Sequence, residues 1–205
     1  MANTIKIFLS LISAAILFAL SAEARADLQA GIAAYDTANY PAALAEFRPL
    51  ADSGDAKAQF ALGVMYAQGN GVQQDYKEAA SWYLKAAEQG VVLAQFNLGM
   101  MYREGRGVRQ DFNAALGWFR KAAANGHVIA QYMLGAIYYK GHGVAQDYKQ
   151  AMSWLRMAAE QGHPQAQRLL GMMYHNGEGV PQDYNEATKW FRKAAEQVRR
   201  MKEVI

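Results

Sequence analysis

The stretch GNGVQQDY, residues 69–76, returns three more times in closely related form. The copies are GRGVRQDF at 105–112, GHGVAQDY at 141–148 and GEGVPQDY at 177–184, so each begins 36 residues after the one before. A strict period of this length indicates a stacked array of one supersecondary unit. Such arrays bind other molecules more often than they transform them. The period therefore predicts an architecture and a broad class of function, without naming a partner.

The segment before each stretch predicts a helix with one buried face. In the first full repeat, Ala58, Leu62, Met65 and Tyr66 recur at helical spacing. A glycine interrupts this helix at a cost of about 1 kcal/mol relative to alanine. It is found in all four repeats, as Gly63, Gly99, Gly135 and Gly171. Repetition of a costly residue predicts a place where two helices cross too closely for a side chain.

The stretch itself predicts a helix end, a tight loop and a new helix start. Gly69 can adopt the left-handed conformation that ends a helix, and Gly71 supplies a second positive φ. Asp75 is a good N-cap, and Glu78 three residues later completes a capping box. Residues 76–87 then carry a wide apolar face. No segment alternates with period two, so strands are not expected. The predicted fold is all-α, built from αα-hairpins.

The chain divides into a leader, a cap, an array and a tail. Residues 1–26 are expected to be a signal peptide, residues 27–54 an atypical N-terminal capping repeat, and residues 199–205 a helical tail. Between cap and tail lie four 36-residue repeats over residues 55–198, at 55–90, 91–126, 127–162 and 163–198. Within the cap, we expect a helix from Ala30 to Ala38, a turn at Asn39–Tyr40, and a second helix that starts at Pro41 and is kinked or shortened at Pro49.

The leader has the order of a secretory signal peptide. Lys6 precedes an apolar run over residues 7–20, and Ala24-Arg25-Ala26 follows as a small-residue cleavage site. The run is shorter than the roughly 20 residues of a membrane helix. An uncleaved anchor is the alternative, and a lipid-modified N-terminus is excluded because the chain has no cysteine. We expect a periplasmic or secreted protein with no stable membrane insertion after signal removal.

Charge gives no support for a nucleic-acid partner. Removing Lys6, Arg25 and Glu23 from 21 basic and 18 acidic residues leaves 19 and 17, a net charge of +2. This balance lacks the strongly basic surface that binding to phosphates requires.

The repeat resembles a known family. The pattern Ala-Gln-x2-Leu-Gly-x2-Tyr-x2-Gly-x-Gly-Val-x2-Asp-Tyr, followed by Trp and by Lys-Ala-Ala-x2-Gly, is similar to the SEL-one-like repeat, a relative of the tetratricopeptide repeat, and covers residues 55 to about 197. The resemblance implies a right-handed α-solenoid whose concave face binds proteins or peptides, often in signalling or envelope complexes. Some exported relatives are cysteine-rich and have been linked to penicillin binding, and this link does not carry over to a chain without cysteine.

Catalytic patterns are not found. The hydroxyl residues after residue 26 form neither Ser-x-x-Lys nor Gly-x-Ser-x-Gly. The Gly-x-Gly loops lack the strand and the Lys-Ser/Thr of a phosphate-binding loop. His127 and His163 lie one period apart without further ligands at suitable spacing, so we expect exposed turn histidines rather than a metal site. No enzyme activity and no cofactor are predicted. The alternative is a cell-wall-associated hydrolase or peptidoglycan-binding protein.

A second stripe on the first helix of each repeat avoids the core positions. Its members occupy positions i, i+3, i+7 and i+10, and they differ between repeats. We call it the first-helix stripe and predict that it binds the partner through Lys57, Phe60, Val64, Phe96, Met100, Arg103, Tyr132, Ala136, Tyr139, Arg168, Met172 and His175. Ala67, Leu93, Ile129 and Gln165 complete its columns. The alternative is partial burial of the stripe between repeats.

The last helix continues its apolar face to the end of the sequence. Tyr184, Ala187, Phe191, Ala194, Val198, Met201 and Ile205 lie at helical spacing. We call Tyr184, Phe191, Val198 and Met201 the end face, and we predict self-association or partner docking there. The alternative is a curved last helix that folds its tail back over the fourth repeat.

Overall fold

The structure, a computed structural model, describes residues 28–203 of the 205-residue chain, and these residues are helical apart from short loops. The expected signal peptide lies outside them. Residues 28–36 form the first described helix. It is followed by α2 (Tyr40–Asp52), α3 (Ala56–Gln68), α4 (Tyr76–Glu88), α5 (Val92–Glu104), α6 (Phe112–Ala124), α7 (Val128–Lys140), α8 (Tyr148–Glu160), α9 (Pro164–Asn176) and α10 (Tyr184–Glu203). Over this range there is no strand, and the predicted all-α class is confirmed.

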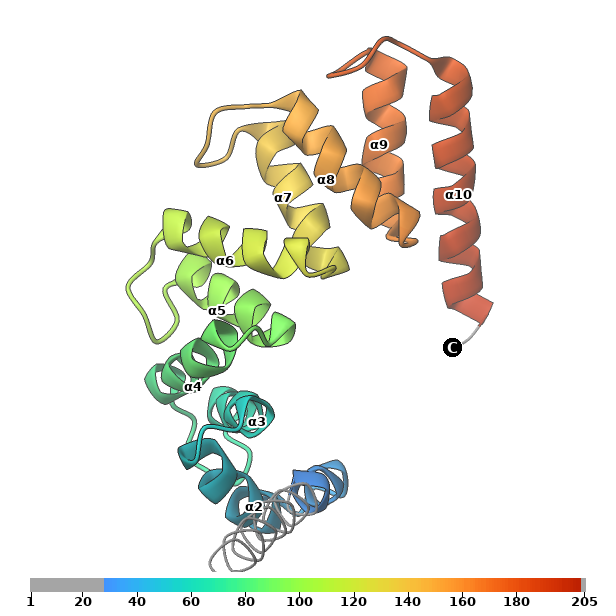
Figure 1. The fold of residues 1–205 in the computed structure, drawn as a ribbon. Coiled ribbons are helices and arrows are strands. Elements are labelled where there is room, and N and C mark those ends of the chain that lie inside the picture. The colour runs from blue at the N-terminus through green and yellow to red at the C-terminus, as the bar shows by residue number, and fades with distance from the viewer. Residues whose placement is uncertain (1–27, 204–205) are drawn as a thin grey trace, which may run out of the picture. The chain divides into compact units, whose positions relative to one another are not determined.

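Two compact units divide the chain between Val91 and Val92. In the first unit, α2 packs on α3 and α3 forms a hairpin with α4. In the second, the hairpins α5/α6, α7/α8 and α9/α10 follow one another, with α6 packed on α7 and α8 packed on α9 (Figure 1). This serial packing of αα-hairpins is the α-solenoid arrangement that the period predicts.

The repeated loop forms as predicted in most respects. Gly69 caps α3 with φ +75°, and Gly71 has φ +72°. The Asp75 carboxylate accepts hydrogen bonds from the backbone N–H groups of Lys77 at 2.8 Å and Glu78 at 3.1 Å. The predicted capping box is wrong in its second half, because the Asp75 N–H donates to the Tyr66 carbonyl at 3.0 Å and is not left for the Glu78 side chain. This bond ties the start of the second helix to the end of the first.

The helical glycines lie where the two helices of a hairpin meet, as predicted. A Cβ on Gly99 would be 2.7 Å from the Phe119 ring and 3.3 Å from the Ala115 carbonyl oxygen. A Cβ on Gly135 would be 2.5 Å from Leu155 Cγ. The obstacle is chiefly a bulky side chain lying flat on the glycine, with the partner backbone slightly further away.

Within each unit, a buried glutamine near the start of a first helix links that helix to the repeat before it. Gln131 is 4% exposed, and its amide donates to the Ala123 carbonyl, at the end of α6, at 3.0 Å. Its side-chain oxygen accepts from Gln161 at 2.8 Å. Gln59 and Gln167 make the same bond to the carbonyl eight residues earlier. This role of the Ala-Gln pair was not predicted.

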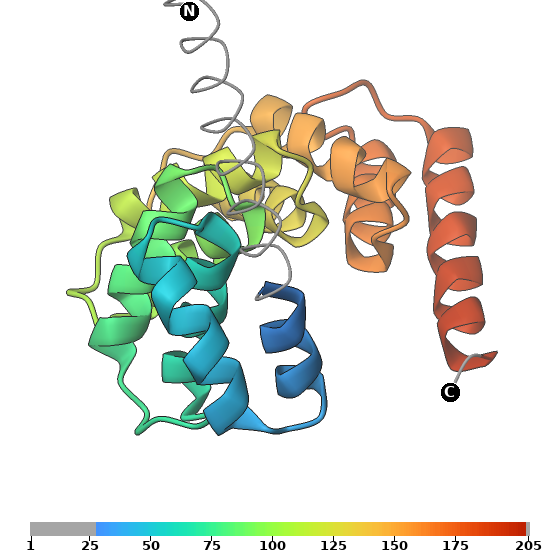
Figure 2. The same ribbon diagram turned by 60° about the horizontal axis from the view of Figure 1, so that its bottom comes forward.

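The cap differs in detail from the prediction. Its first helix ends at residue 36, and Asn39 is the N-cap of α2, accepting from the Ala42 N–H at 3.5 Å. Tyr40 is therefore helical rather than part of a turn. Pro49 neither ends α2 nor shortens it, since the helix continues to Asp52. The helix of residues 28–36 and α2 form an antiparallel pair (Figure 2) in which a Cβ on Gly31 would be 2.5 Å from the Phe47 ring.

Candidate binding surface

In the first unit, the first-helix stripe lies on α3 and faces the helix of residues 28–36. Lys57 is exposed, and Phe60 and Val64 are half-buried. The Phe60 ring packs against Tyr83 with 5.8 Å between centroids. The three stripe residues line an apolar cavity of about 330 Å³, whose other walls are Leu28, Ile32, Tyr35, Phe47 and Ala61.

In the second unit, the stripe runs over α5, α7 and α9, and two of its aromatic rings, those of Phe96 and Tyr132, are each stacked on a histidine. The Phe96 ring lies 4.4 Å from the His127 ring at 25°, and Tyr132 lies 4.5 Å from His163 at 23°. Phe96 also packs against Phe119 at 5.8 Å. Both rings are half-buried. One side of each ring is therefore held by the protein while part of it stays accessible.

These two histidines are half-buried N-caps, so the prediction of exposed turn histidines is wrong for them. His127 Nδ1 accepts the Ala130 N–H at 3.2 Å at the start of α7, and His163 Nδ1 accepts the Ala166 N–H at 3.2 Å at the start of α9. Burial lowers the pKa of both imidazoles below the usual value. A sequence signal did exist, because Asp55 occupies the same position before α3.

The stripe becomes more polar toward α9. On α5, Met100 is half-buried and Arg103 pairs with Glu104 at 2.7 Å. On α7, the Tyr139 hydroxyl donates to Glu178 at 3.0 Å, and burial together with this carboxylate raises the pKa of Tyr139 to about 12. Ala136 on α7 is half-buried and occupies the same stripe column as Met100. On α9, the stripe residues Arg168, Met172 and His175 are exposed.

The end face is partly exposed and adjoins the stripe. Tyr184, Phe191 and Val198 are exposed, while Ala187 and Ala194 on the same helix are buried against α9. Together with Pro164, Gln165, Arg168 and Ala195, the residues Phe191, Ala194 and Val198 line an open depression of about 590 Å³. The stripe residue Arg168 thus lies beside the end face. The backbone of Met201 is helical, and its side chain is outside the described set.

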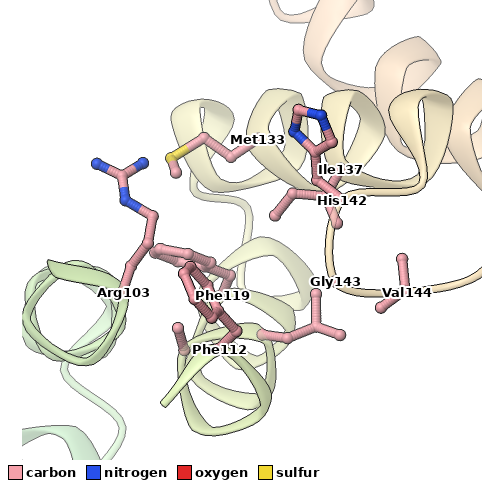
Figure 3. Close-up of a pocket in the computed structure, with 10 residues that line it drawn as sticks. Arg103, Phe112, Phe119, Met133, Ile137, His142, Gly143 and Val144 are labelled. Atoms are coloured by element: carbon pink, nitrogen blue, oxygen red, sulfur yellow. The ribbon is translucent and has the colours of Figure 1, made fainter. Parts of the chain in front are cut away.

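A separate cavity of about 230 Å³ opens between the second and third repeats (Figure 3). Its walls come from the end of α5, from α6, from α7 and from the loop after α7. They are Arg103, Phe112, Ala115, Leu116, Phe119, Met133, Ile137, His142, Gly143 and Val144. Of these residues, only Arg103 was among the predicted site residues, since the others belong to core or loop positions.

Hydroxyl chemistry is limited on these surfaces. Thr37, Ser53 and Thr188 donate to helical carbonyls three or four residues earlier, which is the usual local bond of such residues. Within residues 28–203, no group of three or more histidine, aspartate or glutamate side chains is arranged to hold a metal ion. In that range there is also no helix with the length and apolar character needed to cross a bilayer. The prominent features are binding features: stacked aromatic rings and apolar hollows.

The architecture and this surface define a helical repeat scaffold of the α-solenoid class. The chain belongs to the Sel1 repeat (SEL-one-like repeat) family, whose model matches residues 56–91, 92–127, 128–163 and 164–198. Repeats of this family are generally non-catalytic scaffolds for protein interactions.

Several solved structures are similar to this chain. A Sel1 repeat protein from Oxalobacter formigenes is 37% identical with a TM-score of 0.78, over 82% of this chain and 69% of that one. The protein c5321, a protective antigen of uropathogenic Escherichia coli strains, is 40% identical with a TM-score of 0.80, over 88% of this chain and 39% of that one. A Sel1 repeat protein from Klebsiella pneumoniae, at 23% identity and a TM-score of 0.52 over 90% of this chain and 95% of that one, shares the fold. No curated protein matches the chain.

Proposed function

We propose that this chain is an exported, non-catalytic adaptor that binds a protein or peptide partner through the first-helix stripe. The observation that carries the proposal is the pair of half-exposed rings, Phe96 and Tyr132, each stacked on a histidine. The membership of the chain in a family of interaction scaffolds supports it. A regulator of an envelope complex is one form that such an adaptor takes.

The geometry favours the rings as anchors. Aromatic residues dominate the energy of many protein interfaces, and those already fixed in one conformation lose little entropy on binding. His127 and His163 restrain the rings from one side and are themselves fixed by their capping bonds. The stripe therefore offers a partner rigid apolar contacts, flanked by the positively charged side chains of Arg103 and Arg168.

The test is capture of a partner by the purified protein from the cell that exports it. The double variant Phe96→Ala, Tyr132→Ala is expected to lose capture while its circular dichroism still shows full helical content. Met157→Ala is the matched control, because it removes an exposed large apolar side chain from α8, away from the stripe. Unchanged capture by a folded double variant contradicts the proposal, and loss of folding would assign both rings to the core.

A muropeptide binding assay on the same protein distinguishes the rival class. Binding of muropeptides without capture of any protein would replace the adaptor with a cell-wall-binding protein. For the expected export, the measurement is the mass of the purified chain, with a mature N-terminus at Asp27 as the predicted result. Residues 1–26 found intact would favour the anchor.

The end face is proposed to mediate self-association. Phe191 and Val198 present apolar surface on α10, next to the depression that they share with α9. Light scattering is expected to show association for the mature chain, and less of it for Phe191→Glu and for a chain ending at Gln197. Three monomers with equal partner affinity would contradict this role.

A further inference from the structure

The cavity between the second and third repeats has apolar walls and one permanently charged residue at its edge. Phe112 and Phe119 project from α6, while Met133 and Ile137 line it from α7 (Figure 3). Arg103 reaches in from α5 with its guanidinium on the side of Met133 (Figure 3). The cavity is thus built from three helices and the loop after α7.

One substitution within the repeat pattern helps to explain why the cavity is found here. Ile137 occupies the position of Met65, Met101 and Met173 in the other repeats, and these methionines are at most 6% exposed. A methionine is long and flexible enough to fill irregular space between helices. Isoleucine is shorter and branched near the backbone, and Ile137 is only half-buried.

The loop after α7 also stands away from the preceding hairpin. A Cβ on Gly143 would be 3.9 Å from Phe112 Cβ. At the equivalent places, a Cβ on Gly71 would be 2.7 Å from Tyr40 Cβ, and one on Gly179 would be 2.8 Å from the Tyr148 carbonyl oxygen. The Gly143 loop is therefore less tightly packed than these two, and Phe112 is left 58% exposed at the rim.

The size of the cavity selects its occupant. An apolar cavity of about 150 Å³ accepts benzene, whereas pockets for drug-sized ligands begin at about 300 Å³. A volume of about 230 Å³ lies between them and suits one aromatic or large aliphatic side chain. The Arg103 guanidinium donates to Glu104 at 2.7 Å, and with five N–H donors an arginine can also bind a second carboxylate.

We propose that this cavity is a specificity pocket that takes one aromatic or large aliphatic side chain of the peptide partner, next to a carboxylate that binds Arg103. This inference rests on the proposed function and deepens it. Arg103 belongs to both the pocket and the first-helix stripe, and the pocket residue Phe119 packs against the stripe residue Phe96 at 5.8 Å. A peptide lying on the stripe can therefore insert a side chain here.

The probe is N-acetylphenylalanine, compared with N-acetylphenylalaninamide and N-acetylalanine. Binding is followed by NMR of the methyl groups of Met133 and Ile137 in the purified chain. We expect saturable shifts for the phenylalanine probes only, with the free carboxylate bound more tightly than the amide. Arg103→Gln is expected to remove the difference between acid and amide. No saturable shift at these methyl groups overturns the proposal.

Filling the pocket gives the sharper variant. Ile137→Met installs the residue of the other three repeats, and we expect it to weaken probe binding about tenfold or more, equivalent to at least 1.4 kcal/mol, without lowering the melting temperature. Met157→Ile is the matched control, since this exposed residue on α8 undergoes the reverse exchange outside both the cavity and the stripe. Equal binding by wild type and Ile137→Met, with Met133 shifts as the readout, contradicts the pocket.

Partner capture separates failure of the pocket from failure of the proposed function. Capture that is equal for wild type and Ile137→Met, but lost in Phe96→Ala, Tyr132→Ala, overturns the pocket and leaves the adaptor intact. Probe binding by a chain that captures no protein or peptide overturns the adaptor, and with it the peptide side chain as occupant.

Discussion

The second and fourth repeats pack their hairpins in nearly the same way, yet the same residue is buried in one and exposed in the other. Phe119 covers Gly99 and Phe191 covers Gly171, and in each case a Cβ on the glycine would be 2.7 Å from the ring. Phe119 is 1% exposed and Phe191 is 37% exposed. The helix α6 packs against α5 on one side and α7 on the other, whereas α10 packs extensively against α9 alone among the described helices. Contacts within a hairpin are therefore specified by its own sequence, while burial of its outer face depends on the neighbouring hairpin.

A second difference concerns the buried glutamines. In the second repeat Asn125 donates to Gln95 at 3.4 Å, but the Gln167 side-chain oxygen is buried without a hydrogen-bond donor among the described residues. The second helices of the first three repeats end just before a glycine with positive φ, such as Gly126. Val198 stands at that position in the fourth, and α10 continues to Glu203. Gln197 thus remains inside a helix. Its counterparts are C-cap residues that each donate to the buried glutamine of their own repeat: Gln89, Asn125 and Gln161.

The largest expected effect comes from removing the two phenylalanine rings. Phe119→Ala should lower the free energy of unfolding by about 3–5 kcal/mol, the usual cost of emptying a buried aromatic site. Phe191→Ala should cost about 1–2 kcal/mol, because its ring is already partly in water. Urea unfolding of both variants measures the difference. Equal losses would mean that the outer face of α10 is covered in solution, as self-association through the end face would cause, and dilution would then restore the difference.

A smaller effect is expected from adding side chains at the glycines under these rings. Gly99→Val should cost about 1–3 kcal/mol, because the ring of Phe119 is enclosed and cannot yield. Gly171→Val should cost about 1 kcal/mol less, since Phe191 can swing toward solvent. The nearest backbone atoms, at 3.3 and 3.2 Å, are alike in the two sites, so the ring is the variable. An unchanged melting temperature for Gly99→Val would show that the glycine is merely tolerated there.

Much of the fold could be predicted because the same local sequence signals recur in each of the four repeats. The period, the helix-ending glycine at 69 and the capping aspartate at 75 are local signals, and their consequences lie within a few residues of chain. The glycines at 63 and its counterparts indicated close packing through repetition alone. One local error, the second half of the capping box, arose because the Asp75 N–H bonds to Tyr66 nine residues earlier.

The candidate site was less predictable, because its features arise where repeats differ and meet. The histidine caps bring together residues 31 positions apart, such as Phe96 and His127. The pocket depends on one shortened side chain, Ile137, combined with the position of a loop that carries the same glycines as the others. The spacing of the first-helix stripe identified the columns on α5 and α7, but it could not show that one side of each ring is stacked on a histidine.

The smallest expected effect is a loss of stability in mild acid, to which His127 in the third repeat and His163 in the fourth should contribute alike. Burial lowers the pKa of His127 and His163 below 6.5 in the folded chain. The unfolded chain therefore binds protons more readily, and the free energy of unfolding falls as the pH drops below about 6.5 until the folded pKa is passed. Protonation also removes the Nδ1 acceptor from the capping bond and places a positive charge at a helix N-terminus.

The comparison is made with His127→Asp and His163→Asp, which install the cap that Asp55 provides to α3 through its 2.8 Å bond to the Ala58 N–H. Urea midpoints at pH 7.5 and 5.5 should fall less with acid for either variant than for wild type. The two reductions should be similar, because both caps have the same 3.2 Å bond and nearly the same ring stacking, although one lies in the third repeat and the other in the last.

His142→Asn, on an exposed loop, is the control and should keep the wild-type dependence. If the double variant His127→Asp, His163→Asp is as acid-sensitive as wild type, the caps are not the titrating groups. A reduced acid dependence in His163→Asp alone would show that the fourth repeat differs from the third at the start of α9 as well as at the outer face of α10.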